Sequence, residues 1–206
     1  MKPQTDSGLV LVIVIMLLAI LAALALSLVV VMTTETQIAS NYAASREVMY
    51  AADGAIEIAA QELLAFSDWN VLLGGGATSS FVDGPPTTTR RLSDGRSLIL
   101  GAATDTANTQ PRPWGANNPV WRAFAYGWLG PITYVVAWVG DDPAENDGDP
   151  AHDGNDPANP GSGIIAIRAE AFGTGGARKI VEATLRRTVD EAGNPTMQML
   201  SWAELR

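Results

Sequence analysis

The chain has 206 residues, contains no cysteine and carries a net charge of −9. The lack of cysteine excludes disulfides, thiol nucleophiles and cysteine-bound metals, and the acidic balance argues against nucleic-acid binding, which needs a basic surface. Apolar residues make up 47% of the chain, and many of them are concentrated near the N-terminus.

Residues 9–32 form a run in which Ser27 is the only polar side chain. As a helix this run is about 36 Å long, enough to cross the roughly 30 Å hydrocarbon core of a bilayer. A secretory signal peptide has a shorter apolar segment behind a basic head, whereas Lys2 is the only basic residue here, so a retained transmembrane helix is favoured. We expect the small side chains in this run to permit close helix packing, namely Ala22, Ala23, Ala25 and Ser27.

Polarity changes abruptly between Gly8 and Leu9. Gly8 is either an ordinary junction residue or the last residue of a leader that is cut off before the apolar run. With residues 1–8 short and the bulk of the chain behind the helix, we expect the large C-terminal part to lie outside the cytoplasm.

The helix is expected to continue beyond the membrane, because Gly54 is the only glycine or proline between Thr33 and Phe66. Apolar or small residues recur there at spacings of three and four and predict one apolar stripe: Ile38, Tyr42, Ser45, Met49, Ala52, Ile56, Ala59, Leu63 and Phe66. The opposite face carries polar residues: Glu35, Gln37, Arg46, Glu47, Asp53, Glu57 and Glu62. The stripe of this amphipathic segment, residues 33–68, is expected to pack on the downstream domain, with a coiled coil as the alternative.

The N-terminal region resembles that of type IV pilins and pseudopilins, which also have a short leader ending in glycine and a long helix. Residues 33–55 resemble PilX-like minor pilins in particular, in the residues Thr33, Thr34, Ile38, Ala39, Asn41, Arg46, Ala51, Ala52, Asp53 and Ala55. Residues 163–206 resemble that family loosely, through a Gly-Thr-Gly-Gly turn, an Arg-Arg strand end and a late Leu-Ser-Trp.

This resemblance implies cleavage after Gly8 by a prepilin peptidase and methylation of the new N-terminus at Leu9. Major pilins carry a glutamate at the fifth position after the cut, where this chain has Ile13. The family therefore implies a minor pilin that primes or caps a type IV pilus, held in the bacterial inner membrane before it joins a pilus (fimbrium). The implied partners are other pilins and the inner-membrane assembly platform. A tip adhesion module and the tip pseudopilin of type II secretion are the alternatives.

The downstream domain, residues 69–206, is expected to form a small sheet of three to five strands. Residues 97–102 and 134–140 are predicted as strands, and residues 164–172 and 178–188 as an antiparallel hairpin around a turn at Gly173–Gly176. Residues 74–89 and 104–118 are predicted as loops. The fold class is therefore α+β, with a long N-terminal helix on an antiparallel sheet in the manner of pilins.

Seven carboxylates and no lysine or arginine lie in the loop at residues 141–160. The simplest interpretation is a solvated acidic loop. The alternative is a calcium site, because aspartate and asparagine oxygens beside glycine turns are the ligands that Ca²⁺ prefers, although the EF-hand order is missing. The favoured ligands are Asp147, Asp149, Asp153 and Asp156, ahead of Asp141 and Asp142.

No nucleophile elbow, phosphate-binding loop or histidine-rich metal motif is present, and the chain has a single histidine. The sequence therefore predicts a protein that is not an enzyme.

Overall fold

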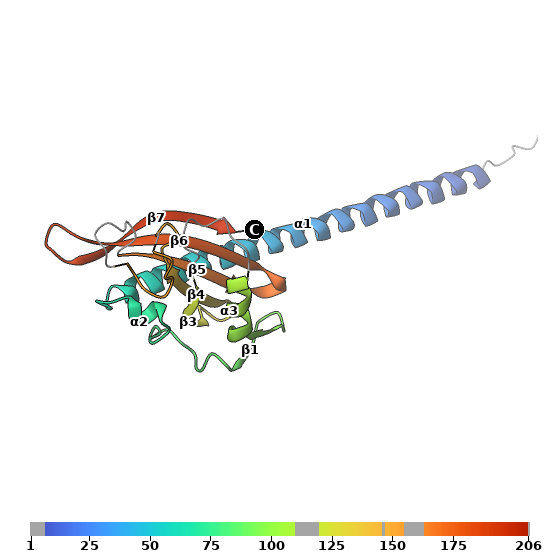
Figure 1. Cartoon of the computed structure of the whole chain (residues 1–206). Helices are drawn as coiled ribbons and strands as arrows, with labels where there is room; N and C mark the ends of the chain where they lie inside the picture. The colour runs from blue at the N-terminus through green and yellow to red at the C-terminus, as the bar shows by residue number, and fades with distance from the viewer. Residues whose placement is uncertain (1–6, 110–119, 146, 155–162, 206) are drawn as a thin grey trace, which may run out of the picture. The chain divides into compact units, whose positions relative to one another are not determined.

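The computed structural model of the chain describes residues 7–109, 120–145, 147–154 and 163–205. The chain divides into two compact units, Met1–Ala43 and Ala44–Arg206. Helix α1, Ser7–Leu63, is continuous and provides the described part of the first unit and the start of the second (Figure 1). The long helix is therefore confirmed, and it ends at Leu63 rather than near Phe66.

In the first unit, every side chain described from Gly8 to Ala43 is exposed. Three threonines follow the apolar run, and the hydroxyls of Thr33, Thr34 and Thr36 donate to backbone carbonyls of the preceding turn at 2.8–2.9 Å. These hydroxyls are thus satisfied inside the helix, and α1 continues from its apolar to its polar part without a break.

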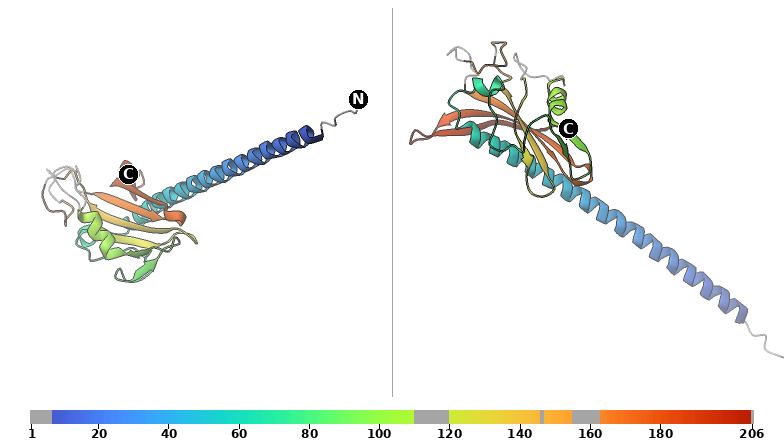
Figure 2. Two further views of the ribbon diagram at one scale, coloured as in Figure 1. Left: turned by 90° about the vertical axis from the view of Figure 1, so that its right-hand side faces the viewer. Right: turned by 90° about the horizontal axis from the view of Figure 1, so that it is seen from below.

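The second unit contains a five-stranded antiparallel sheet in which each strand pairs with the next along the chain (Figure 2). Its strands are β3 (Arg122–Trp128), β4 (Tyr134–Asp141), β5 (Ile164–Phe172), β6 (Arg178–Val189) and β7 (Pro195–Leu205). The smaller elements are α2 (Asn70–Leu73), β1 (Thr89–Arg91), β2 (Ser97–Ile99), α3 (Leu100–Thr109) and the 3-10 turn η1 (Thr174–Gly176). Strands β1 and β2 form a separate antiparallel pair. The observed class is α+β, as the sequence predicts.

The C-terminal part of α1 packs on one face of the sheet. Alternate residues of the strands point toward it, and small helix residues such as Ala52 and Ala59, both fully buried, permit close approach. The helix residues in this core are Val48, Ala51, Ala52, Ala55, Ile56, Ala59, Ala60 and Leu63. The expected stripe is confirmed from Ala52 to Leu63 but is too narrow, because it omits four buried helix residues: Val48, Ala51, Ala55 and Ala60. Ile38 and Tyr42, which belong to the first unit, are exposed and not buried as expected.

The opposite face of the sheet is covered by α3 and the β1–β2 pair (Figure 2). Trp138 donates from its indole nitrogen to the Thr104 hydroxyl of α3 at 2.8 Å. Arg90 of β1 is buried and forms an ion pair with Asp83 at 2.7 Å, and the same carboxylate accepts the Tyr134 hydroxyl at 3.0 Å. This polar network fixes the segment before β1 to the start of β4.

The sequence prediction is wrong between residues 100 and 109. The strand expected over residues 97–102 ends at Ile99, and α3 occupies part of the expected loop at residues 104–118, of which residues 110–118 lie outside the described residues. Leu100 and Ala107 are both buried and are two helical turns apart, so their burial favours a helix here. Strands β1, β3 and β7 were not expected from the sequence pattern.

The predicted hairpin and its turn are confirmed as β5, η1 and β6. Gly175 and Gly176 have φ values of 62° and 80°, which side chains rarely adopt. Gly173 is required for a different reason: a Cβ atom there would lie 2.5 Å from Cγ1 of Val48 on α1. The turn therefore lies directly against the helix.

Candidate functional site

Helix α1 is the one helix among the described residues that is long and apolar enough to cross a membrane. Its apolar side chains in the first unit are exposed, among them Ile13 at 48%. Exposed apolar side chains are unfavourable in water and favourable in the hydrocarbon core of a bilayer. A helix also satisfies its own backbone hydrogen bonds, which the bilayer core requires. The helix thus fits a membrane anchor, as the sequence predicts.

The proposed processing bond, Gly8–Leu9, lies in the first turn of α1. Helix ends fray readily, because their first amides have no partner within the helix. The small residues Ala22, Ala23, Ala25 and Ser27 are all exposed. Cleavage at Gly8 and close helix packing at these four positions stay predictions.

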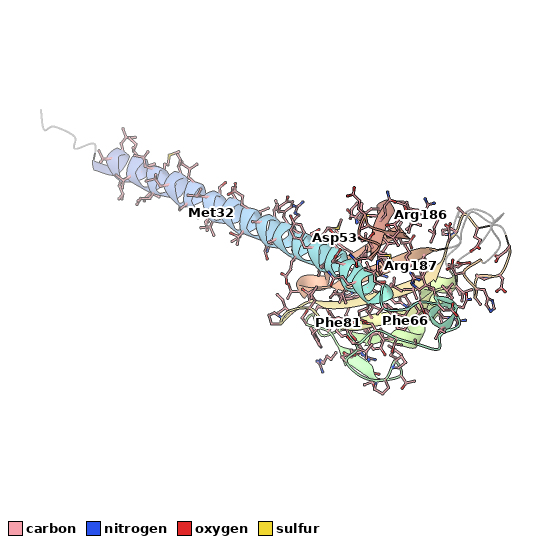
Figure 3. The ribbon with its side chains drawn as sticks, turned by 90° about the vertical axis from the view of Figure 1, so that its left-hand side faces the viewer. Met32, Asp53, Phe66, Phe81, Arg186 and Arg187 are labelled. Carbon is pink, nitrogen blue, oxygen red and sulfur yellow. The ribbon has the colours of Figure 1, made fainter. Side chains whose placement is uncertain are left out.

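The C-terminal end of α1 is held by two side chains from other parts of the second unit. Arg187 of β6 donates to the carbonyl oxygens of Leu63 at 3.3 Å, Ser67 at 3.0 Å and Phe66 (Figure 3). Its guanidinium lies 4.2 Å from the centre of the Trp69 ring, and the Trp69 indole also donates to the Leu63 carbonyl at 3.1 Å. Leu63 is the last residue of α1, and Phe66 and Ser67 follow it, so these donors fix the segment in which the chain leaves the helix.

Three carboxylates of α1 that were expected to face solvent instead hold the domain on the helix. Glu47 accepts the Thr133 hydroxyl at 2.8 Å, and Asp53 accepts the Trp202 indole N–H at 3.0 Å. Glu62 accepts the backbone N–H and the hydroxyl of Ser80. Burial acts to raise the pKa of Glu62, but hydrogen bonds from Ser79, Ser80 and Phe81 together lower it. The helix is therefore attached along both sides of its apolar face.

The acidic loop brings three carboxylates together at the end of β4. Oxygens of Asp141, Glu145 and Asp147 all lie within 4.8 Å of one another. Asp141 and Glu145 are fully buried, and Asp147 is exposed. Burial, together with the charge of Glu145, raises the pKa of Asp141 to about 8, and burial also raises the pKa of Glu145.

The ligands favoured from the sequence are only partly in this cluster. Asp147 belongs to it, whereas Asp149 contacts His152 at the surface at 2.8 Å and Asp153 accepts the Gly163 backbone N–H at 2.8 Å. Asp156 lies outside the described residues. The sequence pattern ranked Asp141 lower and did not favour Glu145, but Asp141 is the last residue of β4, whose eight residues are all buried, so it lies inside the protein. Calcium binding stays a prediction.

Helix α1 carries the similarity to known proteins over most of its length. Residues 7–57 match the family model described as PilX N-terminal. The matched segment contains the apolar run and all ten residues on which the sequence resemblance depends. No curated protein and no solved structure matches the chain.

Proposed function

We propose that the chain is a minor pilin that primes or caps a pilus rather than forming its bulk, because residues 7–57 match the family model described as PilX N-terminal. Before assembly it would be held in the inner membrane by α1, with residues 44–206 on the extracytoplasmic side. After cleavage at Gly8 the apolar half of α1 would pack among the helices of other pilins. The role is structural and involves no reaction catalysed by this chain.

The observation that carries this proposal is the uncharged anchor. No carboxylate occurs in α1 before Glu35, and Ile13 stands at the position where major pilins carry glutamate. A carboxylate inside a bilayer costs about 2.5 kcal/mol or more unless it is paired, so its presence in major pilins indicates a partner in the assembly. A chain without this group has no such link to a preceding subunit, which suits the first position in a filament.

Two alternatives remain within the same family. A tip module that binds a surface would use loops of the second unit instead of the anchor. The tip pseudopilin of type II secretion is expected to carry a large helical insertion, and the two helices described within the domain are the short α2 and α3. We therefore rank the secretion role below the pilus role.

Deletion of the gene distinguishes the proposed role from the adhesion role. Loss of pili from the cell surface, restored by the wild-type gene, supports assembly. Normal pili with lost adhesion would contradict the proposal and support the tip module. N-terminal sequencing of the mature chain tests processing separately: we expect Leu9 as the first residue, and a mature chain that begins at Met1 would refute cleavage.

A further inference from the structure

The two edge strands of the five-stranded sheet differ in whether another segment of the chain bonds to their outer side. At the β3 edge, Ser79 donates its backbone N–H to Phe124 at 2.9 Å, and Tyr126 donates to the carbonyl of Phe81 at 2.8 Å. Val82 forms a parallel bridge with Tyr126. Strand β7 pairs with β6 on one side, and within the described part of the chain no strand pairs with its other side. The outer backbone groups of β7 are thus open to a further strand.

Strand β7 has few of the features that usually protect such an edge, and they are Pro195 and Glu204 near its two ends and a shift in its pairing with β6 at Leu200. Natural sheets place charges, proline or short strands there to prevent pairing with other chains. Strand β7 has 11 residues, and no charged residue occurs from Pro195 through Ala203. Three apolar side chains of this stretch are exposed, namely Met199 at 51%, Leu200 at 42% and Trp202 at 43%.

An apolar groove runs beside this edge, between β7 and α1. It has a volume of about 260 Å³, and its apolar lining includes Ile56, Ala60, Leu185, Met197 and Met199. The hydrogen bond from Trp202 to Asp53 fixes the strand to the helix at 3.0 Å. The groove is therefore held in place before any partner binds, which reduces the entropy cost of binding.

Charge selects among the possible occupants. Glu57 is the only charged residue in the lining of the groove, and its side chain is exposed. The β7 strand of a second copy would bring no basic residue to Glu57, because it is uncharged from Pro195 through Ala203. A segment with apolar side chains and a lysine or arginine beside Glu57 would complement both the groove and its charge.

We propose that β7 accepts an extended segment of another protein as a sixth strand, with alternate apolar side chains in the groove and a basic side chain beside Glu57. Backbone hydrogen bonds supply most of the affinity in this type of recognition, and the side-chain pockets supply the specificity. The inference is independent of the position that the chain takes in a pilus.

Hydrogen exchange of the full chain in detergent micelles tests this inference. The probe is a synthetic peptide of alternating valine and threonine with one central lysine. We expect it to slow exchange of the β7 amides that point away from β6 by about tenfold at saturation, because those amides become hydrogen-bonded. A control peptide in which proline replaces several threonines cannot donate to the ladder and should leave exchange unchanged.

Substitutions locate the site and its charge preference. Met199→Glu should weaken peptide binding about tenfold or more, whereas the matched Val189→Glu, at an exposed residue outside the groove, should change it less than about twofold. Glu57→Lys should weaken binding of the lysine peptide and strengthen that of the same peptide with glutamate at its centre. No protection of β7 by the lysine peptide, or equal effects of the two glutamate variants, would overturn the proposal. Protection that rises with the concentration of the chain alone would show a second copy as the occupant and would also overturn it.

Discussion

Arg187 offers the most direct test of how the domain is attached to α1. Its guanidinium donates to three carbonyl oxygens at the end of the helix and lies on the Trp69 ring. Arg187→Met keeps most of the aliphatic stem and removes all of these polar contacts. The Leu63 carbonyl keeps its bond from the Trp69 indole, whereas the Phe66 and Ser67 carbonyls lose the donor that Arg187 provides.

The expected loss of stability is about 2–3 kcal/mol. A hydrogen bond from a charged donor contributes about 1.5–3 kcal/mol, and a cation–π contact about 0.5–1 kcal/mol at a partly exposed site. Arg187 is half-buried, so water replaces part of what is lost and the contributions do not add in full. For a domain of this size the change corresponds to a fall in Tm of roughly 4–12 °C.

Thermal unfolding of the full chain in detergent, followed by circular dichroism, measures this loss. Arg186→Met is the matched control, because Arg186 is the adjacent residue of β6 and is exposed. Hydrogen exchange of the amides in the last turns of α1 should quicken in the Arg187 variant alone. Equal Tm values for the two variants, with unchanged exchange at the helix end, would refute the assigned role of Arg187.

Three further predictions concern the turn and the acidic cluster. Gly173→Ala should cost about 1–3 kcal/mol in chemical denaturation, because its Cβ would clash with Val48, and Val48→Ala in the same chain should restore part of the loss; no cost would contradict the close contact. In calcium-free buffer the folded state holds the Asp141 proton up to about pH 8, above the usual aspartate pKa, so stability should fall as pH rises from about 4 to about 8. Asp141→Asn should flatten this slope in thermal melts, and an unchanged slope would exclude Asp141 as its source. If Ca²⁺ binds the cluster, it should raise Tm, and Asp147→Asn should weaken the calorimetric signal more than Asp149→Asn does; no heat with the wild-type chain would exclude the site.

The helix and the central hairpin could be predicted from the sequence because local patterns determine them. The apolar run fixes the anchor, and alternation on both sides of Gly173–Gly176 fixes the strands β5 and β6. The boundary between β2 and α3 could not be predicted, since Leu100 is apolar in either element and only tertiary burial selects the helix. Strand β7 carries apolar residues on both faces, so it lacks the alternation that identifies a half-buried strand.

The candidate site was predictable in part for a similar reason. The spacing of carboxylates along the loop at residues 141–160 predicts an acidic site. It does not predict which of these side chains lie close together in the folded protein. Asp141 meets Glu145 because the first ends a buried strand and the second follows a turn back toward it. The hydrogen bonds from Arg187 to the end of α1 join residues more than a hundred positions apart, and no local sequence pattern predicts such a contact.

The closed edge at β3 limits what the open edge at β7 can build. Open-ended growth by strand pairing requires two available edges on every molecule, as in cross-β fibrils. Here a segment of the same chain occupies one of them at Phe124 and Tyr126. This chain can therefore gain a strand from another molecule only at β7, and copies of it cannot stack through both edges as the repeating links of a cross-β fibril.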